Sequence, residues 1–583
     1  MFQKPFSKKL CLFLLLFLFF LLTLASFFRL STVFTAKVFS QLTGTLFRKE
    51  VTSSTLTLHY TLTEPESYGI TEIPVCFQPS DDADAFSEHC QKLLSSLDPS
   101  CLSRSDQITY DILLLLLRQN QTAAQFEGYP EPLGSTIGLQ AQLPILLCEY
   151  RFDSARDIHT YLQLLSTTDQ YFSSLLSYER QKAARGLFMP SSCADGIIRQ
   201  CQAFLEADLS DHLLITSFQQ KISAMATLSS DEKQNFLGKN RQIILQHVLP
   251  AYQLLIQGLT DLKKSCRNEM GLTYLPQGRA YYEYLVQSST GSGLSIHSIQ
   301  NRIQAQLLED ASVCRQILQQ YPSAAGLSTD FVPTDPAFIL LDLQQKMAED
   351  FPSIPDTEYQ LKYVDDALSP YLSPAFYLTA PVDAPDQNVI YLNPSAGYSG
   401  LDLYTTLAHE GFPGHLYQNR YSSDFLSPLR SLFGFSGYTE GWATYVEMIS
   451  YDYAAAGRSD TEHAAVSLAQ KQRSMMLGLS SLIDILVHYH GYTREEVRLF
   501  LRDLGIAGTS VSDSIYDAVL ESPANYLKYY LGYLSFLDLR RWCQKNWPEQ
   551  FQISTFHQFV LEIGPCPFPV LEKYLKLCYT GSL

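Results

Sequence analysis

Hydrophobic residues recur at helical spacing through most of the chain. Between Ala85 and about Leu318 the apolar positions repeat every three or four residues, as in Tyr110–Leu117 and Ile243–Leu262, which is the period of one face of an α-helix. Helical patterns return from Asp402 to about Leu539. The pattern therefore predicts a mainly α-helical body.

A proline-rich stretch between Phe331 and Pro394 interrupts the helical pattern. Within it, Ala375–Thr379 and Asn388–Leu392 are rich in residues that favour strands, and turn-forming residues lie between them at Asp383–Asp386. We expect a small β-sheet near the active-site cleft. We also expect Asn388–Leu392 to be an edge strand that binds the backbone of a substrate by strand addition.

The N-terminus carries the pattern of a membrane segment. Three lysines within the first nine residues precede an uncharged apolar run, Leu10–Phe28, which Arg29 closes. As a helix this run spans roughly 28 Å, enough to cross a bilayer. The sequence favours an uncleaved transmembrane anchor over residues 1–29, with the rest of the chain outside the cytoplasm. A cleaved signal peptide, with a weak cleavage site at Thr23–Ala25, is the alternative.

Composition predicts one folded body behind this anchor. Of the 583 residues, 46% are hydrophobic and 17% are charged, a globular balance. We expect a connector over residues 30–60 and a single body over residues 61–583, with two lobes around a cleft. The net charge of −17 argues against a nucleic-acid partner. The oligomeric state stays open.

Cysteine content fits an extracytoplasmic location without requiring disulfides. Cys11 lies in the apolar run, and the eleven cysteines that follow it cannot all pair with one another, so at least one should be free. Several are close enough in sequence to bridge, for example Cys193, Cys201 and Cys266. The sequence has no Cys-x-x-Cys motif of the kind that binds metal through thiolates.

The residues with the strongest chemical signal lie together in the segment Thr405–His415. It contains His409 and His415, with Glu410 directly after the first histidine. Two neutral imidazoles can hold a zinc ion, and an adjacent carboxylate can take a proton from water and pass it to a leaving amine. We expect His409 and His415 to be metal ligands and Glu410 to be the general base.

The spacing of the two histidines requires a break in the helix. They are six residues apart, so in a continuous helix they would point about 120° away from each other. Pro413 and Gly414 lie between them, and proline cannot continue the hydrogen-bond ladder while glycine adopts backbone angles closed to other residues. We expect a break there that turns His415 back towards the metal.

A third ligand is expected downstream. Glu440 follows His409 by about thirty residues, within Gly437–Glu447, and is the first choice. Glu447 lies two turns later on the same helical face, where it could orient a histidine or replace Glu440 as the ligand. Further along, Tyr529 and His488 are candidates for stabilising an oxyanion.

These motifs resemble those of the bacterial domain of unknown function 885 family, which is grouped with the His-Glu zinc peptidases. The specific matches are His409–His415 and Glu440–Ala443. Weaker matches cover most of the body: Leu58–Leu62, Tyr68–Ile70, Gly278–Leu285, Ser289–Gly291, Asp484 with His488, and Pro523–Gly532. The resemblance implies a zincin-like helical fold with His409, His415 and Glu440 as zinc ligands, Glu410 as the base, and Tyr529 and His488 in the site. Many relatives have a second histidine after the residue that matches His415, where this chain has Leu416.

The sequence thus predicts a membrane-anchored, extracytoplasmic zinc peptidase acting on peptide or protein substrates. A zinc amidase or esterase is an alternative because the chemistry at the carbonyl is shared. An inactive surface binding protein on the same scaffold is another, and Leu416 is the residue that motivates it. A serine hydrolase is disfavoured because the sequence has no Gly-x-Ser-x-Gly elbow.

Overall fold

Helices make up most of the computed structural model, as the apolar periodicity predicts. The structure describes residues 32–581 except 79–82, 136, 330, 365–368, 370–371 and 507. The first half of the chain forms a helix over residues 32–51, then α2 (Thr55–Thr61), α3 (Ala83–Ser96), α4 (Arg104–Ala123), α5 (Leu139–Glu149), α6 (Ala155–Leu165), α7 (Thr168–Ala184), α8 (Ser191–Glu206), α9 (Leu213–Ala224), α10 (Ser230–Ile243), α11 (Leu249–Leu262), α12 (Gly278–Thr290), α13 (Ile296–Gln320) and α14 (Pro336–Met347). The second half forms α15 (Gly400–Glu410), α16 (His415–Ser423), α17 (Pro428–Ser431), α18 (Ser436–Ala455), α19 (Asp460–Ile485), α20 (Arg494–Asp503), α21 (Thr509–Glu521), α22 (Asn525–Asn546), α23 (Ile553–Ile563) and α24 (Phe568–Thr580).

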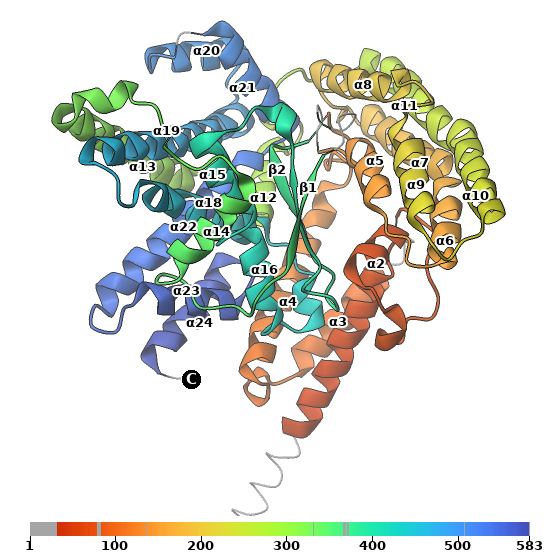
Figure 1. Cartoon of the computed structure of the whole chain (residues 1–583), viewed down its shortest axis with the longest axis horizontal. Coiled ribbons are helices and arrows are strands. Elements are labelled where there is room, and N and C mark those ends of the chain that lie inside the picture. Colours follow the sequence, from red (N-terminus) through yellow and green to blue (C-terminus); the bar gives the residue numbers. More distant parts are fainter. Residues whose placement is uncertain are drawn as a thin grey trace, which may run out of the picture.

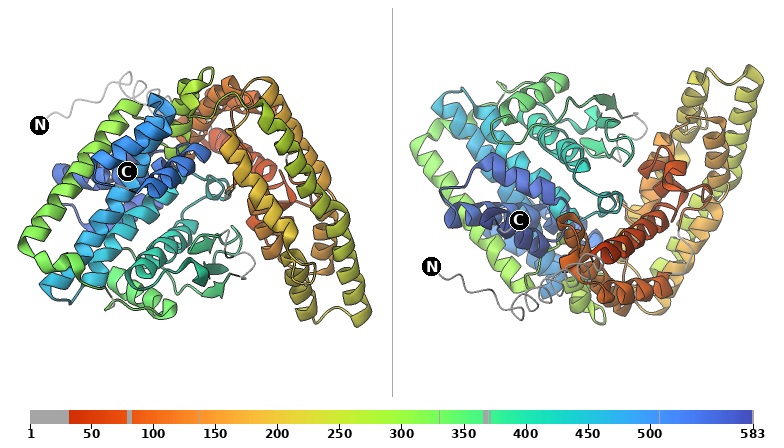
Figure 2. Two further views of the ribbon diagram at one scale, coloured as in Figure 1. Left: turned by 90° about the horizontal axis from the view of Figure 1, so that it is seen from above. Right: turned by 90° about the horizontal axis from the view of Figure 1, so that it is seen from below.

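The body has two lobes, each with its own apolar core (Figure 1). Helices α5 to α11 form the smaller lobe, and Tyr161, Phe172 and Tyr252 are buried in its core. The larger lobe is built around α18 and α22, with Trp442 and Phe536 in its core. Figure 2 shows the two lobes diverging like the arms of a V.

A three-stranded sheet lies between the lobes (Figure 1). Its strands are β1 (Tyr359–Tyr363), β2 (Ala375–Leu378) and β3 (Asn388–Leu392), in the order β1-β3-β2. Successive side chains of β3 point to opposite faces, so Ile390 and Leu392 pack in the larger core while Tyr391 packs in the smaller one. The sheet therefore joins the two lobes.

The position of β3 corrects one expectation. Asn388–Leu392 was expected to be an edge strand, but β3 is central, pairing in parallel with β1 and antiparallel with β2. Its backbone groups are used on both sides, because an apolar strand that is buried on both faces is most stable in the middle of a sheet. Strand β1 was missed at the sequence level. Strands β1 and β2 are the two edge strands of this sheet.

Residues 30–60, expected to be a connector, belong instead to the folded body where the structure describes them. The helix over residues 32–51 buries Phe39, Phe47 and Val51 against α2, α3 and α4. The anchor predicted over residues 1–29 lies outside the described residues. Among the helices that the structure describes, none is long and apolar enough to cross a membrane.

The cysteines considered for bridging are thiols in the structure. Cys193, Cys201 and Cys266 are all free, and the first two are buried. This confirms the expectation that the odd number of cysteines leaves free thiols in the body. Apolar cores of two lobes, rather than disulfides among these cysteines, hold this part of the chain together.

Helices α18 and α22 cross in direct backbone contact. A Cβ atom at Gly441 would lie 2.5 Å from the Cα of Gly532, and a Cβ at Gly532 would lie 2.2 Å from the carbonyl oxygen of Gly437. No side chain fits at these positions. The close approach matters for the site because Glu440 precedes Gly441 on α18, and Tyr529 lies one turn before Gly532 on α22.

Replacing Gly441 by alanine is expected to destabilise the protein by about 2 kcal/mol or more, because the added methyl group forces the two helices apart. The matched control is Gly238→Ala in α10, where nothing lies within 4 Å of the added Cβ. That change should stabilise the helix by roughly 0.5–1 kcal/mol. Urea unfolding of both variants measures the difference, and equal effects would contradict the contact.

Candidate metal centre

The two histidines lie on either side of a sharp break between helices. Helix α15 ends at Glu410 and α16 begins at His415, with Gly411 and Gly414 in non-helical conformations. A Cβ on Gly414 would lie 1.8 Å from the carbonyl oxygen of His409, so only glycine allows the chain to turn back so tightly. The break predicted from the sequence is confirmed.

Helix α18 holds this break in place. The indole Nε1 of Trp442 donates a hydrogen bond of 3.0 Å to the carbonyl oxygen of Pro413. Trp442 is fully buried and lies two residues after Glu440. One helix therefore fixes both the turn that carries the histidines and the carboxylate that faces them.

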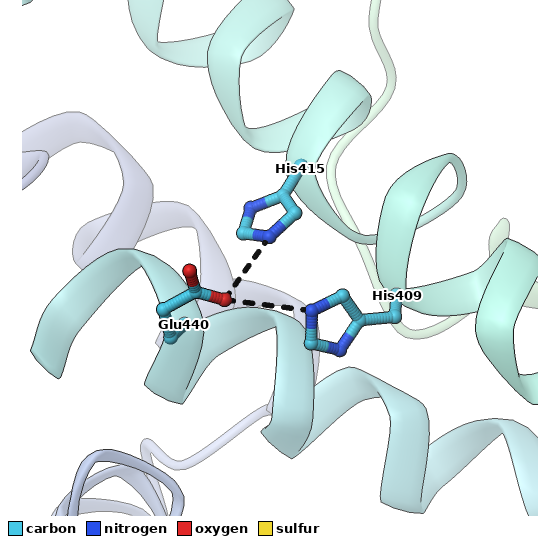
Figure 3. A group of neighbouring side chains, drawn as sticks. All are labelled: His409, His415 and Glu440. Atoms are coloured by element: carbon cyan, nitrogen blue, oxygen red, sulfur yellow. Dashed lines mark ion pairs between the residues drawn. The ribbon is translucent and has the colours of Figure 1, made fainter. Parts of the chain in front are cut away.

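His409, His415 and Glu440 converge on one point (Figure 3). Oε2 of Glu440 lies 3.6 Å from Nε2 of His409 and 3.4 Å from Nε2 of His415. The candidate ligand atoms of all three residues lie within 4.8 Å of one another. The structure thus brings together the three residues that the sequence predicts as metal ligands.

Glu447 lies behind His409 rather than among these three. Its Oε2 is 3.1 Å from Nδ1 of His409. Because a carboxylate only accepts hydrogen bonds, Nδ1 carries a ring proton, and Nε2 is the nitrogen left to hold a second proton or a metal ion. The other oxygen of Glu447 accepts a 2.7 Å hydrogen bond from Nε of Arg473. Of the two roles left open for Glu447, this geometry favours orienting the histidine.

The charges of these groups make the centre attractive to a cation. Burial by itself would lower the pKa of His409, but the carboxylates of Glu440 and Glu447 raise that pKa to about 10. Burial likewise opposes ionisation of Glu440, yet the two histidines hold the pKa of Glu440 well below its usual range. A proton or a metal ion can supply the positive charge that the carboxylates favour.

Glu410 faces the sheet at the edge of the same centre. The backbone N–H of Tyr377 in β2 donates a hydrogen bond of 2.9 Å to Oε2 of Glu410. Burial raises the pKa of this carboxyl, against the opposing effect of the nearby His409 and His415. A raised pKa brings a carboxyl closer to the range in which it exchanges protons at neutral pH.

Tyr529 on α22 also reaches the centre. Its ring centroid lies 6.4 Å from that of His409. Burial raises the pKa of the Tyr529 hydroxyl, and the negative charges of Glu440 and Glu410 raise it further. The hydroxyl is therefore protonated at neutral pH and can donate a hydrogen bond beside the three candidate ligands.

The cavity in front of this centre has a volume of about 890 Å³. His415 and Glu440 form part of its wall, and much of the rest comes from helix α2, the segment Tyr377–Val382, and helices α16 and α17. Hydrogen bonds across the cavity wall link α2 to the sheet, since Val382 N–H donates to the carbonyl oxygen of Thr61 and the carboxylate of Asp383 accepts from the N–H of Thr63. The centre therefore opens onto a space large enough for a small ligand.

Residues 79–575 match the bacterial protein family of unknown function DUF885. The chain belongs to this family. No curated protein matches the chain in sequence. Among solved structures, it is similar to that of a predicted lipoprotein from Colwellia psychrerythraea, with a TM-score of 0.81 and 19% identity over 94% of this chain and all of the other. A predicted lipoprotein of unknown function from Shewanella oneidensis is also similar, with a TM-score of 0.63 and 17% identity over 93% of this chain and 99% of the other. At these identities the likeness shows the fold.

His488, which the family resemblance carried into the site, has a structural position instead. Its ring is 1% exposed. Nδ1 accepts a hydrogen bond from the N–H of Leu272, and Nε2 donates to the carbonyl oxygen of Val519. Both nitrogens are therefore occupied by backbone groups, and His488 is not available to an oxyanion. Through these two hydrogen bonds it connects the C-terminal ends of α19 and α21 with the segment before α12.

Asp484, one turn before His488, has a similar structural role. It is fully buried and accepts hydrogen bonds from the hydroxyl of Tyr282 and from the N–H of Ala524. Ala524 precedes α22 and has a positive φ of 63°. Asp484 thus fixes the start of the helix that carries Tyr529.

Two contributors to the centre escaped the sequence analysis. Arg473 lies 26 positions after Glu447, on α19, and pairs with it only because α18 and α19 pack together. Tyr377 contributes a backbone N–H, which side-chain patterns do not reveal. The helical spacing of Glu447 from Glu440 was the one sequence signal that pointed to the contacts behind the candidate ligands.

The neutral state of His488 predicts a loss of stability in acid. Burial lowers the pKa of His488 to about 4, below the value of about 6.5 in the unfolded chain. The unfolded state therefore binds the extra proton first, and stability falls as the pH drops below 6.5. From pH 7 to pH 5 this histidine should account for a loss of about 2 kcal/mol.

Urea unfolding at pH 7 and pH 5 measures this effect. In His488→Gln the chain should be less stable at pH 7, but its stability should change less between the two pH values than that of the wild-type protein. An unchanged difference between pH 7 and pH 5 would contradict the neutral, buried state of His488.

Proposed function

We propose that this protein is a zinc-dependent hydrolase that cleaves peptide bonds. The observation that carries the proposal is the convergence of His409, His415 and Glu440, with Glu410 beside them and Glu447 behind His409. Two imidazoles, one carboxylate ligand, a nearby base and a carboxylate that fixes a ligand histidine are the parts of a catalytic zinc site.

The donor atoms fit zinc in identity and spacing. In a tetrahedral site with metal–ligand bonds of 2.0–2.1 Å, neighbouring ligand atoms are about 3.4 Å apart. The two distances from Glu440 to the histidine nitrogens, 3.6 and 3.4 Å, are close to that value. Two nitrogens and one oxygen leave a fourth position, as catalytic zinc sites require. A bound zinc ion would supply Lewis acidity towards a carbonyl and increase the acidity of water.

The side chains around the ligands have the positions that hydrolysis requires. Glu410 accepts the proton of the attacking water and delivers it to the leaving amine. The Tyr377 N–H bonded to Glu410 keeps this carboxyl facing the centre. The protonated hydroxyl of Tyr529 donates to the negative oxygen that develops on the substrate carbonyl. Arg473 keeps Glu447 ionised, and Glu447 keeps the lone pair of His409 directed at the centre.

A peptide is the favoured substrate because of the sheet beside the centre. Among the described strands, β2 has a free edge, and the N–H of Tyr377 on that edge points to Glu410. An extended peptide can lie along such an edge with its backbone paired. An amide or ester of another kind would use the same centre without this contact.

We place the body outside the cytoplasm, attached to a membrane through the N-terminal segment. The apolar run Leu10–Phe28 with its preceding lysines supports this location. Two proteins that share the fold are described as predicted lipoproteins.

The alternative of an inactive binding protein loses its main support. It was based on Leu416, which replaces a histidine found in many relatives. The side chain of Leu416 is fully buried in the core of the larger lobe, whereas His415 points to His409 and Glu440. Three candidate ligands therefore come together without a histidine at position 416.

Elemental mass spectrometry of the purified protein tests the metal. We expect about one zinc per chain in the wild type and a large loss in His409→Ala, because two remaining donors hold zinc weakly. His463→Ala, on the exposed face of α19, is the matched control and should keep its zinc. A wild-type chain without metal after incubation with zinc would favour the binding-protein alternative.

Replacing Glu410 by glutamine tests the base. An amide cannot accept the proton, so turnover of a peptide library should fall by roughly 10²–10⁴-fold, while zinc content stays near one per chain. Glu549→Gln, at an exposed turn far along the chain, should keep full activity. An active Glu410→Gln variant would remove Glu410 from the mechanism.

A further inference from the structure

One arginine in the wall of the catalytic cavity lacks an anionic partner. Arg430, on α17, is 1% exposed and lines the cavity that contains His415 and Glu440. Its Nη2 donates to the carbonyl oxygens of Ile563 and Pro565, at 2.7 and 3.2 Å. Its Nε has no acceptor, and among the described residues no carboxylate forms an ion pair with it. Its positive charge is therefore buried against backbone carbonyl oxygens and without a negatively charged partner.

The other buried or half-buried arginines near the cavity are neutralised. Arg420 pairs with Asp386 and Asp424, at 3.1 and 3.2 Å, and Arg473 pairs with Glu447. A charge removed from water without a counter-charge is unfavourable, so such groups in proteins normally have an ionic partner or bind one. Arg430 is the exception beside the cavity.

A second donor in the same wall is also unused. Gln418 is 4% exposed, lines the cavity, and has no acceptor for its Nε2 among the described residues. It lies one turn after His415 on α16, and residues three apart on a helix lie on the same face. The donor is therefore on the face of α16 that carries the metal ligand.

The charges along the cavity wall favour an anion at this position. Apart from His415 and Glu440 of the metal centre, the charged side chains that line it among the described residues are Arg430 and Glu50. Glu50 is exposed, whereas Arg430 is buried. The protected part of the cavity thus has a cation and an amide donor and no acid of its own.

We propose that Arg430 and Gln418 form a carboxylate-binding subsite for the substrate. The inference rests on the proposed peptidase function and specifies its substrates: peptides with a carboxylate near the scissile bond, either the C-terminal carboxylate or an acidic side chain. An arginine and an amide together bind such a group through charge-assisted hydrogen bonds.

The fold sets the distance between the subsite and the metal centre. From His415 to Ser422, α16 rises about 10 Å. The hydroxyl of Ser422 bonds to the carbonyl oxygen of Leu561, and Arg430 bonds to that of Ile563, two residues later. Arg430 therefore lies near the C-terminal end of α16, whereas His415 is at its N-terminal end. An extended peptide covers 10 Å with about three residues, so the carboxylate that binds Arg430 lies within about three residues of the scissile bond.

Binding to the full-length Glu410→Gln protein loaded with zinc tests the subsite without turnover. Three probes share one sequence: acetyl-tetraalanine with a free C-terminus, the same peptide with an amidated C-terminus, and the amidated peptide with glutamate in the last position. We expect the free-acid peptide, the glutamate peptide, or both to bind at least tenfold more tightly than the neutral amide. Which of them does so identifies the source of the carboxylate.

Variants then assign the preference to these residues. With Arg430→Gln added, the carboxylate peptide and the neutral amide should bind with about equal affinity. With Gln418→Leu added, the preference for the carboxylate peptide should fall several-fold. The Gln418 variant also covers the case in which Arg430→Gln does not fold. Equal affinity for all three probes would overturn the subsite and leave Arg430 as a cap on the C-terminus of α23.

Cleavage by the wild-type protein separates the two proposals. A carboxylate preference in binding with no cleavage by the zinc-loaded wild type would reject the peptidase function and keep the subsite. Cleavage of all three probes at equal rates, with equal affinities, would keep the peptidase function and reject the subsite.

Discussion

The contact between Gly414 and the carbonyl oxygen of His409 is the constraint on which the candidate metal centre depends. The backbone of Gly414 lies so close to the end of α15 that no side chain fits there. The chain can therefore reverse direction within four residues, and His415 at the start of α16 faces His409 at the end of α15. A larger residue at position 414 would separate two candidate ligands that come from one short segment.

Helix α18 links this turn to the rest of the centre. Its Trp442 binds the turn, its Glu440 faces both histidines, and its Glu447 orients His409. The glycine contact with α22 brings Tyr529 to the same place. A single rigid helix thus fixes the positions of groups from three other segments, which is the way precise sites are built on a scaffold.

The two lobes and the sheet between them determine what can reach the centre. The alternating side chains of β3 join both cores, and the edge of β2 lies beside Glu410. The cavity that results has His415 and Glu440 of the candidate metal centre in one part of its wall and Arg430, which has no ion-pair partner among the described residues, in another. This combination of a cation-attracting centre and a separate positive charge accounts for both the proposed reaction and the proposed preference for a carboxylate.

The sequence alone predicted the helical class, the strands β2 and β3, the helix break at Pro413–Gly414 and the candidate ligands His409, His415 and Glu440, which the structure brings together. These features depend on local backbone preferences and on residue types whose chemistry is specific. Tertiary structure decided the central place of β3, the structural role of His488, the pairing of Arg473 with Glu447 and the isolation of Arg430. Each of these depends on which segments pack together: a strand is central only if two others flank it, and a histidine is unavailable only if backbone groups from elsewhere occupy its nitrogens. Periodicity along the chain contains no such information, because partners that are distant in the sequence meet only when the cores form.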